Sequence, residues 1–206
     1  MVELMDRIGI KQAILMGHSM GGGIVGYIAS KYPDKVLAAA ILDKTAKGPE
    51  RHIPVLSSQV KEYDAFTKEW NEVFDTRREA LECIKRASAS ELETEYFVNS
   101  LYEDESGYRF LFSKKALAAY RANVYDWMDL LPQIFCKTLL IKSAGEGAVT
   151  SQDFLDMKVC LKDAIAYTMS NTDHNVHLAD KPEFYHIFDQ FLSYIHQEFI
   201  MARQAE

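Results

Sequence analysis

The sequence lacks an excess of positive charge. It carries 23 Lys and Arg against 30 Asp and Glu, a net charge of −7 over 206 residues. A nucleic-acid-binding surface needs a basic face, so that class of protein is excluded. Cysteine is scarce as well: Cys83, Cys136 and Cys160 are scattered and odd in number. Their spacing fits neither a disulfide framework nor a metal site, and we expect reduced, buried thiols.

Long hydrophobic runs are also missing. No apolar segment is long enough to span a bilayer. The N-terminal segment of seven residues is short, amphipathic and acidic, unlike a signal peptide. We therefore expect a cytoplasmic protein with no membrane partner. Hydrophobic residues make up 48% of the chain, which is enough for a core. The length suits one α/β domain with an inserted segment.

The chain instead contains short apolar runs in which apolar and polar residues do not alternate. Four such runs predict strands: residues 12–16, 36–42, 138–141 and 164–169. Helical segments separate them, among them residues 2–8 before Gly9 and 22–31 before Pro33. Continuous apolar strands alternating with helices are typical of a parallel sheet covered on both faces.

The last helix has a clear start. Asp180 can cap it, Pro182 suits its first turn, and Glu183 follows three residues after the cap. Apolar side chains then recur at helical spacing, at Phe184, Ile187, Phe188, Phe191, Leu192, Ile195 and Phe199. We expect this stripe to pack against the sheet.

The alternation of strand and helix stops between Ala46 and Pro132. This segment is rich in charge and aromatic residues and contains no convincing strand. It predicts an inserted cap of several helices, residues 47–132, within a core made of residues 1–46 and 133–206. Most of its aromatic side chains would form the core of the cap, and together they could line an apolar pocket above Ser19. The acidic stretch 91–105 predicts a solvated face.

The pentapeptide Gly17-His18-Ser19-Met20-Gly21 lies where the first apolar run meets a glycine-rich helical run. A G-x-S-x-G turn between a strand and a helix bends the backbone and lifts the serine hydroxyl above the sheet. The flanking positions are expected to be small because strand and helix nearly touch there. The helix N-terminus would then direct free N–H groups at the serine, where acyl transfer develops negative charge.

Several segments together resemble the α/β-hydrolase fold. These are the turn at 17–22, the strand ending at Asp43, the insertion, the strand 138–141 and the segment 173–178. The resemblance implies a partial α/β-hydrolase fold: a mostly parallel sheet of about four strands with flanking helices and an inserted helical cap. It further implies a serine hydrolase that acts, without a cofactor, on a small ester, lactone or related acyl substrate.

The family order of Ser, acid and His assigns roles to single residues. Ser19 would be the nucleophile, which needs an adjacent base, and His174 would be that base. The backbone N–H of Met20 would bind the oxyanion. His18 is expected to be structural, and His177 to pack beneath its loop. The remaining histidines are expected on the cap or on helix surfaces: His52, His186 and His196.

The acid that orients His174 has two candidates. The family usually places an aspartate in the loop after the strand 138–141, but residues 143–149 contain none. Asp43, at the end of the second strand, occupies a position that some members of the family use. Glu146 lies in the usual loop, slightly displaced. We favour Asp43 and keep Glu146 as the alternative.

The resemblance also implies something that this sequence does not supply. In the family, four strands precede the strand of the serine turn, and one of their loops provides half of the oxyanion hole. This sequence starts in the helix just before that strand. We therefore expect strand 12–16 to form an exposed apolar edge, covered by a second copy or by a partner chain. The alternative function is a truncated, non-catalytic hydrolase-like domain that binds a ligand or partner.

Overall fold

The computed structural model describes residues 1–49, 53–56, 58–60 and 63–204, without the side chains of 199 and 202–204. His52 lies outside the described residues. The chain folds into two compact units. One unit comprises Met1–Gly48 and Asp126–Glu206, and the other comprises Pro49–Tyr125.

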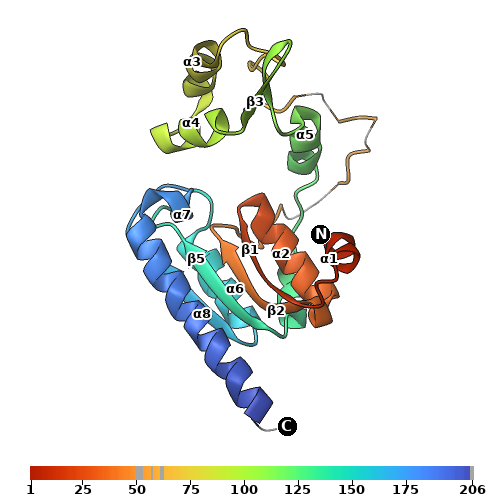
Figure 1. The fold of residues 1–206 in the computed structure, drawn as a ribbon, viewed down its shortest axis with the longest axis vertical. Helices are drawn as coiled ribbons and strands as arrows, with labels where there is room; N and C mark the ends of the chain where they lie inside the picture. Colours follow the sequence, from red (N-terminus) through yellow and green to blue (C-terminus); the bar gives the residue numbers. More distant parts are fainter. Residues whose placement is uncertain (50–52, 57, 61–62, 205–206) are drawn as a thin grey trace. The chain divides into compact units, whose positions relative to one another are not determined.

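The first unit contains a four-stranded parallel sheet (Figure 1). The strands lie in the order β1 (Ala13–His18), β2 (Val36–Leu42), β5 (Lys137–Lys142) and β6 (Ala164–Thr168). The four expected strands and their parallel pairing are therefore confirmed. Strands β2 and β5 are central and buried on both faces, which explains why their sequences are continuously apolar. Strand β1 forms one edge of the sheet.

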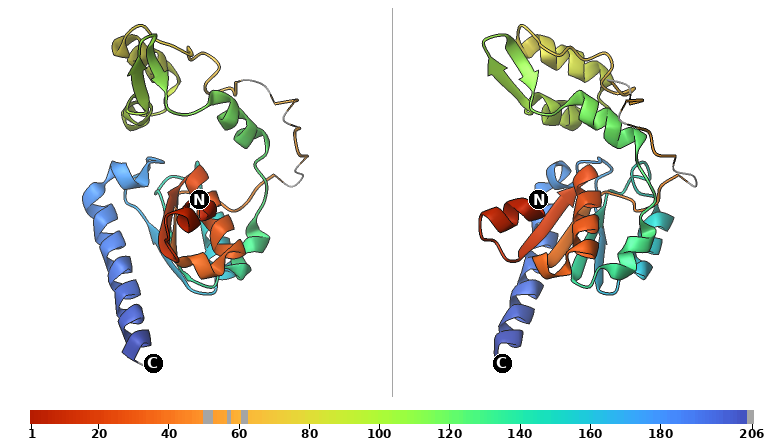
Figure 2. Two further views of the ribbon diagram at one scale, coloured as in Figure 1. Left: turned by 45° about the vertical axis from the view of Figure 1, so that its right-hand side comes forward. Right: turned by 90° about the vertical axis from the view of Figure 1, so that its right-hand side faces the viewer.

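Helices cover both faces of this sheet, as Figure 2 shows from two further sides. Val25 and Ile28 of α2 (Met20–Lys31), Leu131 of η2 (Met128–Gln133) and Met157 of α6 (Ser151–Cys160) pack in one hydrophobic cluster. The long helix α8 (Lys181–Gln204) packs in the second cluster against the buried residues of β2 and β5. The helical elements of this unit are α1 (Val2–Arg7), α2 (Met20–Lys31), η1 (Pro33–Lys35), η2 (Met128–Gln133), α6 (Ser151–Cys160), α7 (Val176–Ala179) and α8 (Lys181–Gln204).

Helix α8 begins where the sequence predicts. The Asp180 carboxylate accepts a hydrogen bond from the Glu183 backbone N–H at 3.0 Å, as an N-terminal cap does. The Glu183 carboxylate accepts from the N–H and hydroxyl of Ser170, which ties the loop after β6 to α8. The buried members of the apolar stripe are Phe184, Ile187, Phe191 and Ile195. The side chain of Phe199 lies outside the described part of the chain.

The segment 126–132 lies with the core, although the sequence suggests the cap. Trp127, Leu130 and Leu131 are buried in the cluster that α2 covers. A Cβ on Gly26 would lie 2.5 Å from the Trp127 ring, so this glycine gives the indole its space. The aromatic and apolar character that makes 127–131 resemble the cap comes from packing on α2 instead.

The second unit contains helices α3 (Arg77–Ala87), α4 (Glu91–Val98) and α5 (Lys114–Ala122). It also contains an antiparallel hairpin of β3 (Leu101–Asp104) and β4 (Gly107–Phe110), so the expectation that this segment contains no strand is wrong. Each strand has only four residues, and β3 is mostly exposed and polar. Such a strand lacks the apolar run that would reveal it. Gly107 makes the turn with a φ of 122°, in the region that favours glycine.

Aromatic side chains form the core of this second unit. Trp70 stacks on Phe110 with ring centroids 5.1 Å apart and meets Phe66 and Phe97 edge to face. These rings belong to one cluster with the buried faces of α3 and α4. Packing with one another therefore accounts for much of the aromatic content of the segment.

All three cysteines are free. Cys83 is buried in the aromatic cluster as expected, but Cys136 and Cys160 are only partly buried. Burial raises the pKa of the Cys136 thiol above its ordinary value, which disfavours the reactive thiolate. Within the described residues, no helix is long and apolar enough to cross a membrane.

Candidate active site

Ser19 occupies a strained turn between β1 and α2. Its φ is 51° and its ψ is −117°, a backbone conformation that L-residues rarely adopt. The Ser19 N–H donates to the carbonyl of Leu42 at 2.9 Å, and its own carbonyl accepts from the N–H of Gly22. Strain of this kind costs about 1–3 kcal/mol and persists at functional sites where the surroundings enforce it.

The glycines of this turn are not equivalent. A Cβ on Gly17 would lie 2.1 Å from the backbone oxygen of Gly21, and one on Gly22 would lie 2.9 Å from Cβ of Lys44. By contrast, a Cβ on Gly21 would meet no atom within 4 Å. The close approach of strand and helix therefore requires glycine at 17 and 22. Position 21, where the sequence pattern also predicts a small residue, could hold a larger side chain than glycine.

Asp43 lies in a second strained turn, directly after β2. Its φ is 44°, and among the described residues only Ser19 and Asp43 combine a positive φ with a side chain. The Asp43 side chain is fully buried. Its Oδ1 accepts a hydrogen bond from the N–H of Ser143 at 2.8 Å, and its own N–H donates to the carbonyl of Ile141. Strand β5 and the residue after it thus hold both the backbone and the carboxylate of Asp43.

His174 completes a pair with Asp43. Its Nδ1 lies 2.8 Å from Oδ2 of Asp43, and a carboxylate partner means that Nδ1 carries the proton. In the neutral ring, Nε2 is then free to accept a proton. Ser19, Asp43 and His174 follow β1, β2 and β6, so all three lie at the edge where the parallel strands end. The described contacts include no hydrogen bond between the Ser19 hydroxyl and His174.

Glu146 lies in a different environment. Its carboxylate is exposed and accepts hydrogen bonds from the N–H and hydroxyl of Ser151. It also pairs with the buried ammonium of Lys142 at 3.4 Å. The Ser151 hydrogen bonds, more than Lys142, hold the Glu146 pKa below its ordinary value. The structure therefore brings Asp43, and not Glu146, to His174.

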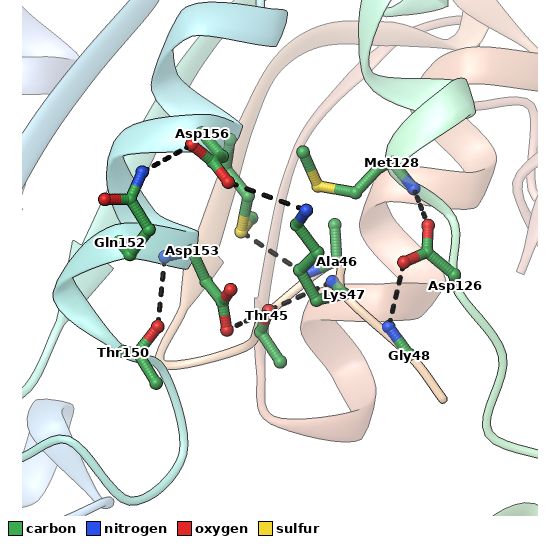
Figure 3. Close-up of polar contacts among 11 residues, drawn as sticks. Thr45, Ala46, Lys47, Gly48, Asp126, Met128, Thr150, Gln152, Asp153 and Asp156 are labelled. Atoms are coloured by element: carbon green, nitrogen blue, oxygen red, sulfur yellow. Dashed lines mark hydrogen bonds and ion pairs between the residues drawn. The ribbon is translucent and has the colours of Figure 1, made fainter. Parts of the chain in front are cut away.

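The loop that follows Asp43 is anchored to α6 (Figure 3). The Thr45 hydroxyl lies 3.4 Å from Asp153, and the Lys47 ammonium lies 3.5 Å from Asp156. Between them, the N–H of Ala46 contacts the sulfur of Met157. These contacts keep the chain fixed immediately after the strained Asp43 turn.

Three histidine rings lie together beside the site. The ring centroid of His18 is 4.5 Å from that of His174 and 4.9 Å from that of His177. Burial, followed by repulsion from His174, lowers the pKa of His18 to about 4. Burial also lowers the pKa of His177, again with His174 as the second cause. Both flanking rings are therefore neutral at pH 7, so a proton on His174 would meet no positive neighbour within the cluster.

The low pKa of His18 predicts a loss of stability in mild acid. The unfolded chain, with a pKa near 6.5, binds the proton before the folded chain does. The contribution of neutral His18 to the free energy of unfolding is fully present above pH 6.5 and is lost as the pH falls toward 4. Between pH 7 and pH 5 we expect the parent protein to lose about 2 kcal/mol of unfolding free energy that the His18→Phe variant keeps.

Urea unfolding at the two pH values measures this difference. His186→Phe is the matched control, because His186 is an exposed histidine on α8, and it should retain the pH dependence of the parent. Equal losses in the parent and in His18→Phe would show that His18 is not the responsible group.

The N-terminus of α2 faces the serine turn. The N–H groups of Gly22 and Gly23 donate to the carbonyl of Ser19. Among the described residues, no hydrogen bond engages the preceding N–H groups of Met20 and Gly21. The helix end also carries partial positive charge, so this turn can stabilise an anion at Ser19.

Two contacts at the site are not predicted by the sequence. Ser143 donates its backbone N–H to Asp43, and His18 contacts the backbone of His174. Ser143 directly follows β5, and the rule that neighbouring parallel strands end at one edge could have found it. The sequence offers no comparable signal for the His18 contact, which joins residues far apart in the chain.

The sheet, the strained serine turn and the order of the site residues define a hydrolase-type α/β fold. A family model described as "alpha/beta hydrolase fold" matches residues 1–178. The chain therefore belongs to the α/β hydrolase family.

Individual relatives agree with this assignment. The chain is 24% identical over 186 residues to a Haemophilus influenzae protein named "Putative esterase/lipase", and the match covers 89% of the chain but 61% of that relative. It is 34% identical over 118 residues to a Mycobacterium phage D29 protein named "Putative non-heme haloperoxidase", and this match covers 56% of the chain and 41% of that relative. The structure also resembles that of E-2-(acetamidomethylene)succinate hydrolase, with a TM-score of 0.74 and 17% sequence identity. The superposition covers 93% of this chain and 70% of the hydrolase chain. The chain thus spans less than two thirds of the length of these two curated relatives.

Proposed function

We propose that this protein is a serine hydrolase that acts on a small ester, lactone or related acyl substrate. One observation carries the proposal: the His174–Asp43 pair lies at the same sheet edge as a strained serine on a helix N-terminus. Packing alone does not call for two strained residues and a buried carboxylate paired with a histidine at one edge. The names of the esterase/lipase relative and of the similar hydrolase structure support hydrolysis as the reaction class.

The reaction would proceed in two halves. The Ser19 hydroxyl attacks the substrate carbonyl while His174 Nε2 takes its proton, and Asp43 stabilises the resulting imidazolium. The Met20 N–H donates to the oxyanion of the tetrahedral intermediate. The alkoxide leaves with the proton from His174, which gives an alcohol and an acyl-serine. Water then attacks the acyl-serine and loses a proton to His174, and the second tetrahedral intermediate collapses. The carboxylic acid leaves as His174 returns that proton to the Ser19 oxygen, which restores the hydroxyl and the neutral histidine.

Hydrolysis of p-nitrophenyl acetate tests this function. The parent protein should release p-nitrophenol, and Ser19→Ala should lower kcat by roughly 10⁴- to 10⁶-fold. Ser193→Ala, which removes a hydroxyl from α8, should leave the rate unchanged. A folded parent with no turnover above the uncatalysed rate would favour the alternative of a non-catalytic binding domain. That alternative is consistent with the assignment of a single oxyanion donor, since losing one donor costs about 2.7–4 kcal/mol.

We also propose that a second copy of the chain covers the free edge of β1. In the described residues, no strand pairs with this edge. Met16 of β1 and Ile24 and Tyr27 of α2 are each nearly half exposed beside it. None of the exposed α2 positions carries a charge before Lys31, so two copies meet here without like-charge repulsion. A two-fold axis would pair the β1 strands antiparallel. We propose in addition that the protein is located in the cytoplasm.

Light scattering on the purified protein tests the dimer. We expect the mass of a dimer for the parent and of a monomer for Met16→Lys, because a lysine at an edge strand opposes pairing. Val159→Lys places the same charge at an exposed apolar position on α6 and should stay dimeric. A stable monomeric parent would refute the proposal.

A further inference from the structure

His18 joins the serine turn to the loop that carries His174. Its Nε2 lies 2.7 Å from the backbone carbonyl oxygen of His174, across 156 positions of sequence. A carbonyl can only accept a hydrogen bond, so Nε2 of His18 carries the proton and donates it. His18 is the covalent neighbour of Ser19. One hydrogen bond thus links the residue before the nucleophile to the backbone of the base.

The surroundings of His18 maintain this donor. The groups that face its ring are the rings of His174 and His177 and, at longer range, the carboxylate of Asp43. Because the pKa of His18 is lowered to about 4, the ring remains neutral at pH 7. A neutral ring with Nε2 protonated avoids placing a second positive charge beside His174 when that residue takes a proton.

We propose that His18 is a positioning residue that fixes the backbone of His174 relative to Ser19. The inference depends on the proposed hydrolase function. The two other elements that hold His174 are Asp43, through its side chain, and the loop after β6. Asp43 connects His174 to the serine turn only indirectly, through the Leu42 carbonyl that accepts from the Ser19 N–H. His18 makes the connection in one hydrogen bond from the residue next to Ser19. General-base catalysis depends on that distance, since a displacement of 1 Å can cost about 100-fold in rate.

His177 offers a matched comparison within the same cluster. Its ring packs against His18 at a similar distance, and its pKa is lowered by burial as well. Its buried Nδ1, however, has no hydrogen-bond partner in the described structure. Replacing His177 with phenylalanine therefore keeps an aromatic ring and removes a buried nitrogen, but it breaks no link between turn and loop.

The experiment compares three variants in p-nitrophenyl acetate hydrolysis and in the rate of Ser19 labelling by a fluorophosphonate. His18→Phe keeps a ring but loses the donor, and we expect kcat and the labelling rate to fall about 10- to 100-fold with KM within twofold. His18→Gln restores an N–H donor and should recover most of the lost rate. His177→Phe should remain within about threefold of the parent. A merely structural role of His18 would not give rescue by Gln.

The outcomes separate this inference from the proposed function. If the parent is active and labelled but His18→Phe reacts at the parent rate, the positioning role is wrong and the hydrolase function stands. If His18→Gln reacts as slowly as His18→Phe, the lost donor is not the cause and the inference is also overturned. An inactive, unlabelled parent rejects both proposals.

A measurement on the unmodified protein covers the case in which His18→Phe does not fold. Nitrogen-15 NMR of the histidine rings should show His18 as the neutral tautomer with Nε2 protonated and slow exchange of that proton with solvent. A His18 ring protonated on Nδ1, or one charged at pH 7, would overturn the inference.

Discussion

Replacement of Asp43 by asparagine is expected to lower kcat by about 10³- to 10⁴-fold with little change in KM. The amide can keep the hydrogen bond to His174 only by changing the tautomer of the ring, because its NH₂ group donates where the carboxylate accepts. It also leaves the imidazolium without a counter-charge. The oxygen facing the Ser143 N–H can remain, so the fold should be preserved. Steady-state hydrolysis of p-nitrophenyl acetate measures the effect.

Glu146→Gln is the matched control for this prediction. Glu146 is the other acid that the sequence nominates, and its partners are Ser151 and Lys142. The same change of carboxylate to amide at Glu146 should leave kcat within about twofold of the parent. A large loss in Glu146→Gln together with a small loss in Asp43→Asn would show that the wrong acid has been assigned.

Gly17→Ala is expected to destabilise the protein by about 3 kcal/mol or more. Its Cβ would lie 2.1 Å from the carbonyl oxygen of Gly21, and only a shift of backbone can relieve that contact. Because Gly17 and Gly21 flank the serine turn, any such shift also moves Ser19. We therefore expect kcat to fall at temperatures where the variant remains folded. Urea unfolding and ester hydrolysis give the two readouts.

Gly21→Ala is the control within the same motif. No atom lies within 4 Å of the position its Cβ would take, and alanine favours the first turn of α2. Its unfolding free energy should equal that of the parent or exceed it by up to about 1 kcal/mol. Equal destabilisation by the two alanines would contradict the packing of strand and helix described here.

The sheet could be predicted because its strands are buried on both faces. Burial leaves a continuous apolar run such as residues 36–42, which coincides with β2 at both ends. The hairpin of β3 and β4 escaped prediction because its strands have four residues each and little buried surface. The aromatic and apolar composition of residues 127–131 resembles that of the cap, and the sequence therefore predicts the wrong unit for them. Only their packing on α2 shows where they belong.

The candidate site could be predicted as far as local sequence determines it. Ser19 is marked by its turn, while Asp43 and His174 each follow an expected strand. The sequence alone left Asp43 and Glu146 open, because the choice depends on which carboxylate reaches His174 in three dimensions. The hydrogen bond from His18 to the His174 carbonyl could not be predicted from the sequence. Its acceptor is a backbone oxygen, which any residue at position 174 would provide.

The central claim is that Ser19 is an activated nucleophile. Treatment with a fluorophosphonate followed by peptide mass spectrometry tests it most directly. The account predicts a stoichiometric adduct on the peptide that contains Ser19. That adduct should be absent in Ser19→Ala and form far more slowly in His174→Ala. A folded protein that stays unlabelled, or that is labelled at another residue with Ser19 unmodified, would contradict it.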